Sequence, residues 1–170
     1  MGAKAIQLSH VNISVRDVKR AEEFYSNILG LTVMFRHGDR ASFLSANEAC
    51  SHEIALVQVG DEVPGPGEPR SRVGLNHMAW QMATFEDLKE VYRKLKQYGA
   101  EIVGIADHHF SLGIYFRDPD GNENEVHYEL PLDEYPRGEN GERFSRANPF
   151  PYQLEDDTTV ESPRRELSLT

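Results

Sequence analysis

His10, His77 and Glu125 are the side chains in this sequence whose types and spacing could bind a metal ion. Each histidine opens one of two similar stretches, 67 residues apart, and the glutamate closes the second stretch. Two imidazoles and one carboxylate on one face of a cation leave positions open for other ligands, which suits non-haem Fe(II) and oxygen chemistry. Each residue alone would be interpreted as structural, but the duplicated frame predicts a metal site.

An internal repeat supports this frame. Ser9-His10-Val11-Asn12 aligns with Asn76-His77-Met78-Ala79, and the helical stretch behind each histidine matches without a gap. The apolar positions recur at i, i+3, i+4 and i+7, which form one stripe of an amphipathic helix. The matched residues are Ala21, Phe24, Tyr25 and Ile28 in the first copy and Leu88, Val91, Tyr92 and Leu95 in the second. Gly30 and Gly99 then stop the two helices.

The repeat predicts two tandem modules, each in the order β-α-β-β-β. The first module spans about residues 5–60, with a strand through His10, a helix capped by Asp17 and three strands near 31–37, 40–45 and 52–59. The second spans 73–130, with a strand through His77, a helix capped by Thr84 and strands near 101–105, 113–117 and 123–130. Residues 61–72, rich in proline and glycine, are the predicted linker. The expected fold class is therefore α+β.

Neither module is expected to close a core alone, so we predict that the two sheets form an incomplete barrel around the metal site. Residues 131–170 are a polar tail with sparse aromatic anchors. We expect part of this tail to cover the body and the last ten or so residues to be disordered. The anchors are Tyr135, Phe144, Phe150 and Tyr152.

The composition is that of a soluble globular protein, with 39% hydrophobic and 27% charged residues among 170. A formal net charge of −10 argues against nucleic-acid binding, which needs a basic surface. One cysteine, Cys50, cannot form an internal disulfide, and no apolar run approaches membrane-spanning length. These features predict a cytoplasmic protein without a membrane partner. Cys50, His37 and His127 are assigned to structure.

Residues 6–130 resemble the vicinal oxygen chelate superfamily, which includes glyoxalases, epimerases, fosfomycin and bleomycin resistance proteins and type I extradiol dioxygenases. The stretch from Ile114 to Glu125, Ile-Tyr-Phe-Arg-Asp-Pro-Asp-Gly-Asn-Glu-Asn-Glu, resembles the motif that closes the superfamily's second module. The resemblance places Glu125 on the metal carboxylate. The turn Asp118–Asn122 is common to the whole superfamily, so it indicates the fold rather than the reaction.

Three further residues resemble the extradiol dioxygenase branch. His52 matches an active-site histidine that acts as acid and base, and Tyr115 matches a tyrosine that hydrogen-bonds the substrate oxygen. Asp107-His108 resembles the dipeptide or lone histidine that contacts a catechol hydroxyl, with His109 as the alternative to His108. The resemblance therefore implies Fe(II), with Mn(II) as an alternative, and a catechol and O2 as substrates. The chain has one pair of modules, as in the small enzymes of this branch, and we expect a homo-oligomer, a dimer or larger.

Glu53 keeps a second interpretation open. It lies ten residues after Phe43, as Glu125 lies ten after Tyr115, so the spacing puts it at the first module's copy of the ligand position. Glyoxalases and epimerases of the superfamily carry a fourth ligand there, around Zn, Ni or Co, and use it for lyase or epimerase chemistry. A third alternative is a resistance protein that binds an antibiotic in a cavity between the modules. Such a protein needs no metal ligands.

Overall fold

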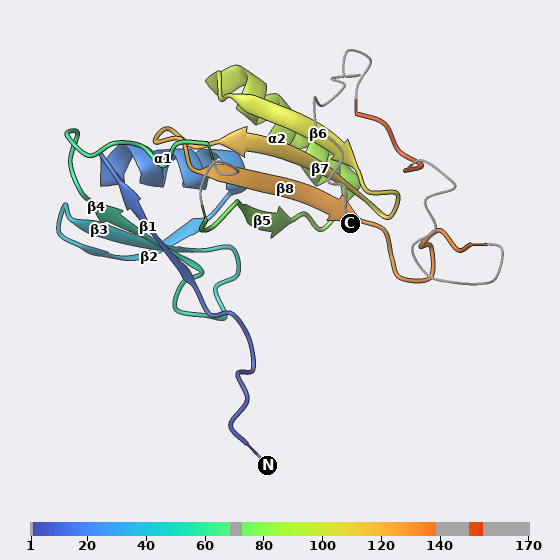
Figure 1. The fold of residues 1–170 in the computed structure, drawn as a ribbon, viewed down its shortest axis with the longest axis horizontal. Coiled ribbons are helices and arrows are strands. Elements are labelled where there is room, and N and C mark those ends of the chain that lie inside the picture. Colours follow the sequence, from blue (N-terminus) through green and yellow to red (C-terminus); the bar gives the residue numbers. More distant parts are fainter. Residues whose placement is uncertain (1, 69–72, 139–149, 155–170) are drawn as a thin grey trace. The chain divides into compact units, whose positions relative to one another are not determined.

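The computed structural model describes residues 2–68, 73–138 and 150–154. The chain divides into two compact units, Met1–Gly67 and Glu68–Thr170, and each unit is described by itself. Both contain a four-stranded sheet with one helix (Figure 1). Among the described residues, no helix has the length and apolar character needed to cross a membrane.

The first unit contains β1 (Val11–Val15), α1 (Val18–Leu29), β2 (Thr32–His37), β3 (Ala41–Ser45) and β4 (Ile54–Gln58). Its strands lie in the order β1-β4-β3-β2. The edge strand β1 runs parallel to its neighbour β4, while β4, β3 and β2 are antiparallel to one another in turn. The parallel pair brings the chain that precedes β1 beside the chain that precedes β4.

Helix α1 begins and ends where its sequence predicts. The Asp17 side chain accepts a hydrogen bond from the backbone N–H of Arg20 at 3.0 Å, and Gly30 adopts the left-handed conformation at φ 71°. The predicted stripe is buried, since Ala21, Phe24 and Tyr25 are fully covered. Helix α1 packs with this stripe on β2, β3 and β4.

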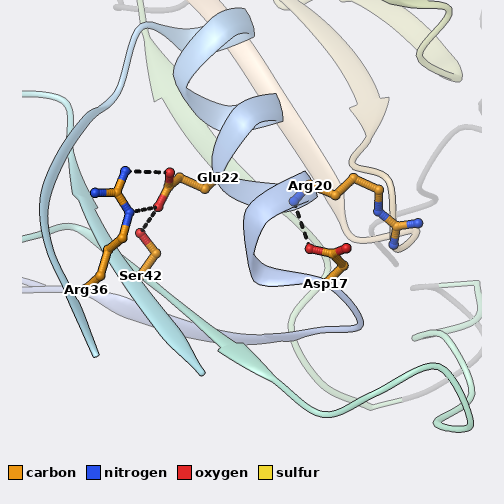
Figure 2. Close-up of polar contacts among 5 residues, drawn as sticks. All are labelled: Asp17, Arg20, Glu22, Arg36 and Ser42. Carbon is orange, nitrogen blue, oxygen red and sulfur yellow. Dashed lines mark hydrogen bonds and ion pairs between the residues drawn. The ribbon is translucent and has the colours of Figure 1, made fainter. Parts of the chain in front are cut away.

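A polar contact also joins α1 to the sheet, as Figure 2 shows. Glu22 of α1 accepts two hydrogen bonds of 2.7 Å from the guanidinium of Arg36 on β2, and one of 2.6 Å from the hydroxyl of Ser42 on β3. The hydrogen bonds from Arg36, despite partial burial, hold the pKa of Glu22 below its ordinary value.

The second unit contains β5 (Met78–Gln81), α2 (Phe85–Tyr98), β6 (Ile102–Asp107), β7 (Ser111–Arg117) and β8 (Glu123–Glu129), with strand order β5-β8-β7-β6. Thr84 and Asp87 form a capping box at the start of α2, and Gly99 ends the helix at φ 76°. The predicted α+β class and the two β-α-β-β-β modules are confirmed. The expectation of an incomplete barrel stays a prediction.

Strand limits differ from the predicted ones around the histidines. His10 and His77 each lie one residue before a strand rather than inside it, because the ladders of β1 and β5 begin at Val11 and Met78. His52 lies two residues before β4 for the same reason. All three imidazoles therefore lie on chain segments that lead into a sheet.

Part of the tail packs on the second unit. Tyr135 is buried and stacks on Phe110, with ring centroids 5.3 Å apart. Phe150 and Tyr152 join the ring of Phe85, at centroid distances of 6.0 and 5.1 Å. The remaining predicted anchor, Phe144, and the last ten residues lie outside the described part of the chain.

Candidate metal centre

His77 and Glu125 lie together in the second unit. The Nε2 atom of His77 is 3.2 Å from Oε2 of Glu125, and the glutamate side chain is only 10% exposed. Two ligand atoms at right angles around a divalent ion, each roughly 2.1 Å from it, lie about 3 Å apart. The separation of these two atoms therefore fits two neighbouring ligands of one cation.

Strand pairing and a small residue hold Glu125 in place. Glu125 lies on β8 and pairs with Ala79 on β5 and with Tyr115 on β7. Its carboxylate lies over Gly113 of β7, where a Cβ atom would collide with Oε1 and approach Cδ to 3.1 Å. The absent side chain at position 113 thus leaves the space that the carboxylate occupies.

The surroundings of Glu125 favour its ionised form. Burial by itself raises the pKa of this carboxyl, but hydrogen bonds from His77 and Tyr115 outweigh the burial and hold the pKa below its ordinary value. Glu125 is therefore a carboxylate at neutral pH, which is the form that binds a metal ion.

His108 and Tyr115 lie beside this pair. The Nε2 atom of His108 is 3.1 Å from the hydroxyl of Tyr115 and 3.8 Å from Oε1 of Glu125. The Tyr115 ring meets the His77 ring edge to face at 5.2 Å. The backbone N–H of His109 donates to Oδ1 of Asp107 at 2.7 Å. Of the two histidines that the sequence left open, His108 contacts the predicted tyrosine.

In the first unit, His10 lies next to His52. Their ring centroids are 4.5 Å apart, and Phe43 packs edge to face on His52 at 5.1 Å. The pKa of His52 is lowered, mainly because burial disfavours the charged imidazole and to a smaller extent because of the nearby charge of His10. His52 is therefore neutral at pH 7. Ser51 Oγ lies 3.0 Å from His52 Nδ1.

Strand register corrects the position inferred for Glu53. Phe43 pairs with Ala55, twelve residues on, whereas Tyr115 pairs with Glu125, ten residues on. The β1–β4 pairing agrees, because Asn12, two residues after His10, lies opposite Ala55. In the second unit Ala79, two residues after His77, lies opposite Glu125. Ala55 is therefore the first module's copy of Glu125. The sequence spacing pointed to Glu53 instead because the loop between β3 and β4 is longer than the loop between β7 and β8.

The carboxylate of Glu53 belongs to that loop. It accepts hydrogen bonds from Ser45 Oγ at 3.1 Å, from the backbone N–H of Ala46 at 2.5 Å and from Asn47 Nδ2 at 2.9 Å. Both of its oxygens are used in these contacts. Glu53 thus closes the turn between β3 and β4.

The predicted ligand set is divided between the units. His77 and Glu125 converge in the second unit, and His10 lies beside His52 in the first. Within the described residues, no group of three or more His, Cys, Asp or Glu side chains is arranged so that it could hold a metal ion. Within the second unit, the imidazole of His77 and the carboxylate of Glu125 are donor types that suit a divalent cation, and Gly113 provides the space that the carboxylate needs.

Two residues of these surroundings escaped the sequence analysis: Gly113 and Ala55. Gly113 had a detectable signal, because a glycine inside a strand marks a close approach, here two residues before the predicted tyrosine. Ala55 could be identified only from register.

A cavity of about 520 Å³ in the first unit is a separate feature. It lies at the start of α1 and is lined by charged side chains, among them Arg16, Lys19, Glu22 and Arg36. Arg16 follows the end of β1, whereas His10 precedes its start, so their backbones lie on the order of 20 Å apart. This cavity is not part of the candidate metal centre.

Residues 7–126 match the sequence model of the Glyoxalase/Bleomycin resistance protein/Dioxygenase superfamily, and the chain belongs to this superfamily. It is 30% identical, over 119 residues, to biphenyl-2,3-diol 1,2-dioxygenase 3 of Rhodococcus globerulus, covering 68% of this chain and 60% of that protein. It is 27% identical to catechol-2,3-dioxygenase of Bacillus subtilis, covering 79% and 45% respectively. The chain thus spans about half of the length of these curated relatives.

A solved structure of the same fold is the fosfomycin resistance protein FosX of Listeria monocytogenes, with a TM-score of 0.58 at 21% identity. The match covers 77% of this chain and 98% of FosX. At this identity the likeness establishes the fold alone. The relatives named as dioxygenases are therefore the ones that bear on the reaction.

Proposed function

We propose that this protein is an extradiol dioxygenase that cleaves a catechol ring beside its vicinal diol and incorporates both atoms of O2. The observation that carries the proposal is the alanine at position 55, opposite Asn12 and Phe43. A methyl group cannot bind a metal, so this position supplies no ligand, and His10 is the one ligand that we assign to the first module. With three protein ligands, an octahedral cation keeps positions for both diol oxygens and for O2.

His10, His77 and Glu125 would hold the metal, which we propose to be Fe(II), with Mn(II) as the alternative. A cation held by these residues would supply Lewis-acid and redox chemistry to the diol and O2. The lowered pKa of Glu125 keeps the carboxylate ready for this role. Its hydrogen bond with Tyr115 ties the ligand to a residue that we assign to substrate binding.

His52, His108 and Tyr115 would handle the substrate. His52 is neutral at pH 7, so its imidazole can accept a proton from a diol hydroxyl and return it when the O–O bond breaks. The Tyr115 hydroxyl and the His108 imidazole, 3.1 Å apart, would hydrogen-bond one oxygen of the substrate. The ring carbons gain both oxygen atoms, and the product is a hydroxymuconic-type semialdehyde.

Metal analysis and oxygen uptake test the proposal. The protein is purified without oxygen, its metal content is measured, and the Fe(II)-loaded form is screened with substituted catechols. Catechol-dependent uptake, with both atoms of isotopically labelled O2 in the product, supports the dioxygenase. A protein that retains Zn, Ni or Co and isomerises a carbonyl substrate without O2 is a lyase or epimerase. A protein that binds an antibiotic without any metal is a resistance protein, and either result would refute the proposal.

A further inference from the structure

The turn that carries His108 is short and strained. Only His108, His109 and Phe110 connect β6 to β7. His109 adopts φ 69°, a left-handed conformation that is unfavourable for a residue with a Cβ atom. Such a conformation persists when neighbouring groups hold it in place. The contacts that hold this turn therefore determine where the His108 imidazole lies.

Each carboxylate oxygen of Asp107 accepts one hydrogen bond. Oδ1 accepts the backbone N–H of His109 at 2.7 Å, and Oδ2 accepts the backbone N–H of Phe150 at 3.0 Å. The carboxylate thus links the strained residue to a chain segment 43 residues further on. A structural role confined to β6 would not require this second bond.

The C-terminal segment around Phe150 is itself anchored. The Phe150 side chain is buried and contacts the rings of Phe85 and Tyr128 at 6.0 and 6.3 Å. Tyr152 stacks on Phe85 at 5.1 Å. This packing fixes the backbone N–H of Phe150 where Asp107 can accept it.

A second contact reaches the turn from the other side. The Tyr135 ring stacks on Phe110, and the carbonyl of Phe110 accepts the N–H of Leu130 at 2.9 Å. Chain segments that follow β8 therefore hold both ends of the turn. His108 belongs to this turn, and its Nε2 atom lies 3.1 Å from the Tyr115 hydroxyl.

We propose that Asp107 is a positioning residue, and that the C-terminal segment acts through it to hold His108 against Tyr115 for substrate binding. The inference deepens the proposed function, because it uses the role assigned to His108. The link between Asp107 and the turn, however, can be tested without any substrate.

Hydrogen exchange of the metal-free full chain provides that test. Asp107→Ala removes both acceptors, so the His109 amide should exchange roughly tenfold faster. Asp107→Asn keeps one oxygen acceptor and should give a smaller increase. Asp133→Asn is the matched control, since this exposed tail carboxylate should leave the turn unchanged. Unchanged exchange in Asp107→Ala, with a native spectrum, would overturn the inference.

A double-mutant cycle tests the part played by the C-terminal segment. Phe150→Ala removes the ring that anchors the segment. Tyr98→Ala, which removes an exposed aromatic ring, is its control. Phe150→Ala should speed exchange at the turn, and it should add little in the Asp107→Ala background. Full additivity of the two changes would show that the segment does not act through Asp107.

Steady-state kinetics then connects the turn to the site. Asp107→Asn should raise KM for the catechol by about tenfold, with a smaller change in kcat, because His108 holds substrate oxygen. An active enzyme with unchanged KM would refute the positioning role. If no catechol supports oxygen uptake, the proposed function fails, while the exchange experiments still decide whether Asp107 holds the turn.

Discussion

Replacing Gly113 by alanine should weaken metal binding without unfolding the protein. The added Cβ would overlap Oε1 of Glu125 and lie 3.1 Å from Cδ and 3.3 Å from Cε2 of Tyr115. Carbon atoms prefer separations of about 3.5–4.0 Å, so the carboxylate must move by about 1 Å. A displacement of that size at a ligand or reacting group can cost on the order of 10²-fold, and we expect a comparable fall in metal affinity.

Stability should respond much less. Gly113 has a negative φ, so alanine fits the backbone and gains roughly 0.5–1 kcal/mol over glycine in a strand. Overpacking costs about 1–3 kcal/mol, which leaves a net loss of roughly 0–2.5 kcal/mol. Urea unfolding should therefore show a folded protein with a slightly lower midpoint, whereas competition with a chromogenic chelator should show the loss of affinity.

A double-mutant cycle with Glu125 decides whether the effect passes through the carboxylate. In the Glu125→Ala background, Gly113→Ala has no carboxylate to displace and should change metal affinity little. Glu125→Asp shortens the side chain by one methylene group and withdraws the carboxylate. In that background, Gly113→Ala should lower metal affinity less than it does in the wild type. Wild-type affinity in Gly113→Ala, or equal losses in both backgrounds, would refute the reasoning.

Three further predictions follow from the same contacts. His52→Gln should keep the metal but lower the rate of oxygen uptake by roughly 10²–10⁴-fold. Glu53→Gln should also keep the metal and mainly loosen the β3–β4 loop. Metal loss in Glu53→Gln would favour the lyase. His77→Ala should lose metal while its circular dichroism stays native, and full occupancy would remove it from the ligand set. Glu22→Gln should lower Tm by a few degrees above pH 4.5, because Arg36 lowers the pKa of Glu22. That difference should shrink as the pH falls below 4.5, where wild-type Glu22 becomes protonated, and a difference that persists there would contradict it.

The sequence predicted the elements well because their signals are local. Asp17, Thr84, Gly30 and Gly99 limit the helices through contacts within one turn. The apolar stripes of both helices are buried as their spacing requires. The position of the tail was not predictable in this way, since the bond between Phe150 and Asp107 joins residues far apart in the chain.

Register is the physical reason why sequence spacing could not decide between the two kinds of enzyme. Counting from Phe43 gives Glu53, but the ladder from Phe43 leads to Ala55, because the longer β3–β4 loop takes up the difference. Loop length changes which residues face each other without changing the pattern inside either strand. A glutamate that spacing assigned to the metal is instead hydrogen-bonded to residues 45–47. The case for three protein ligands, and hence for open positions on the metal, therefore depends on the pairing of Ala55 with Asn12 and Phe43.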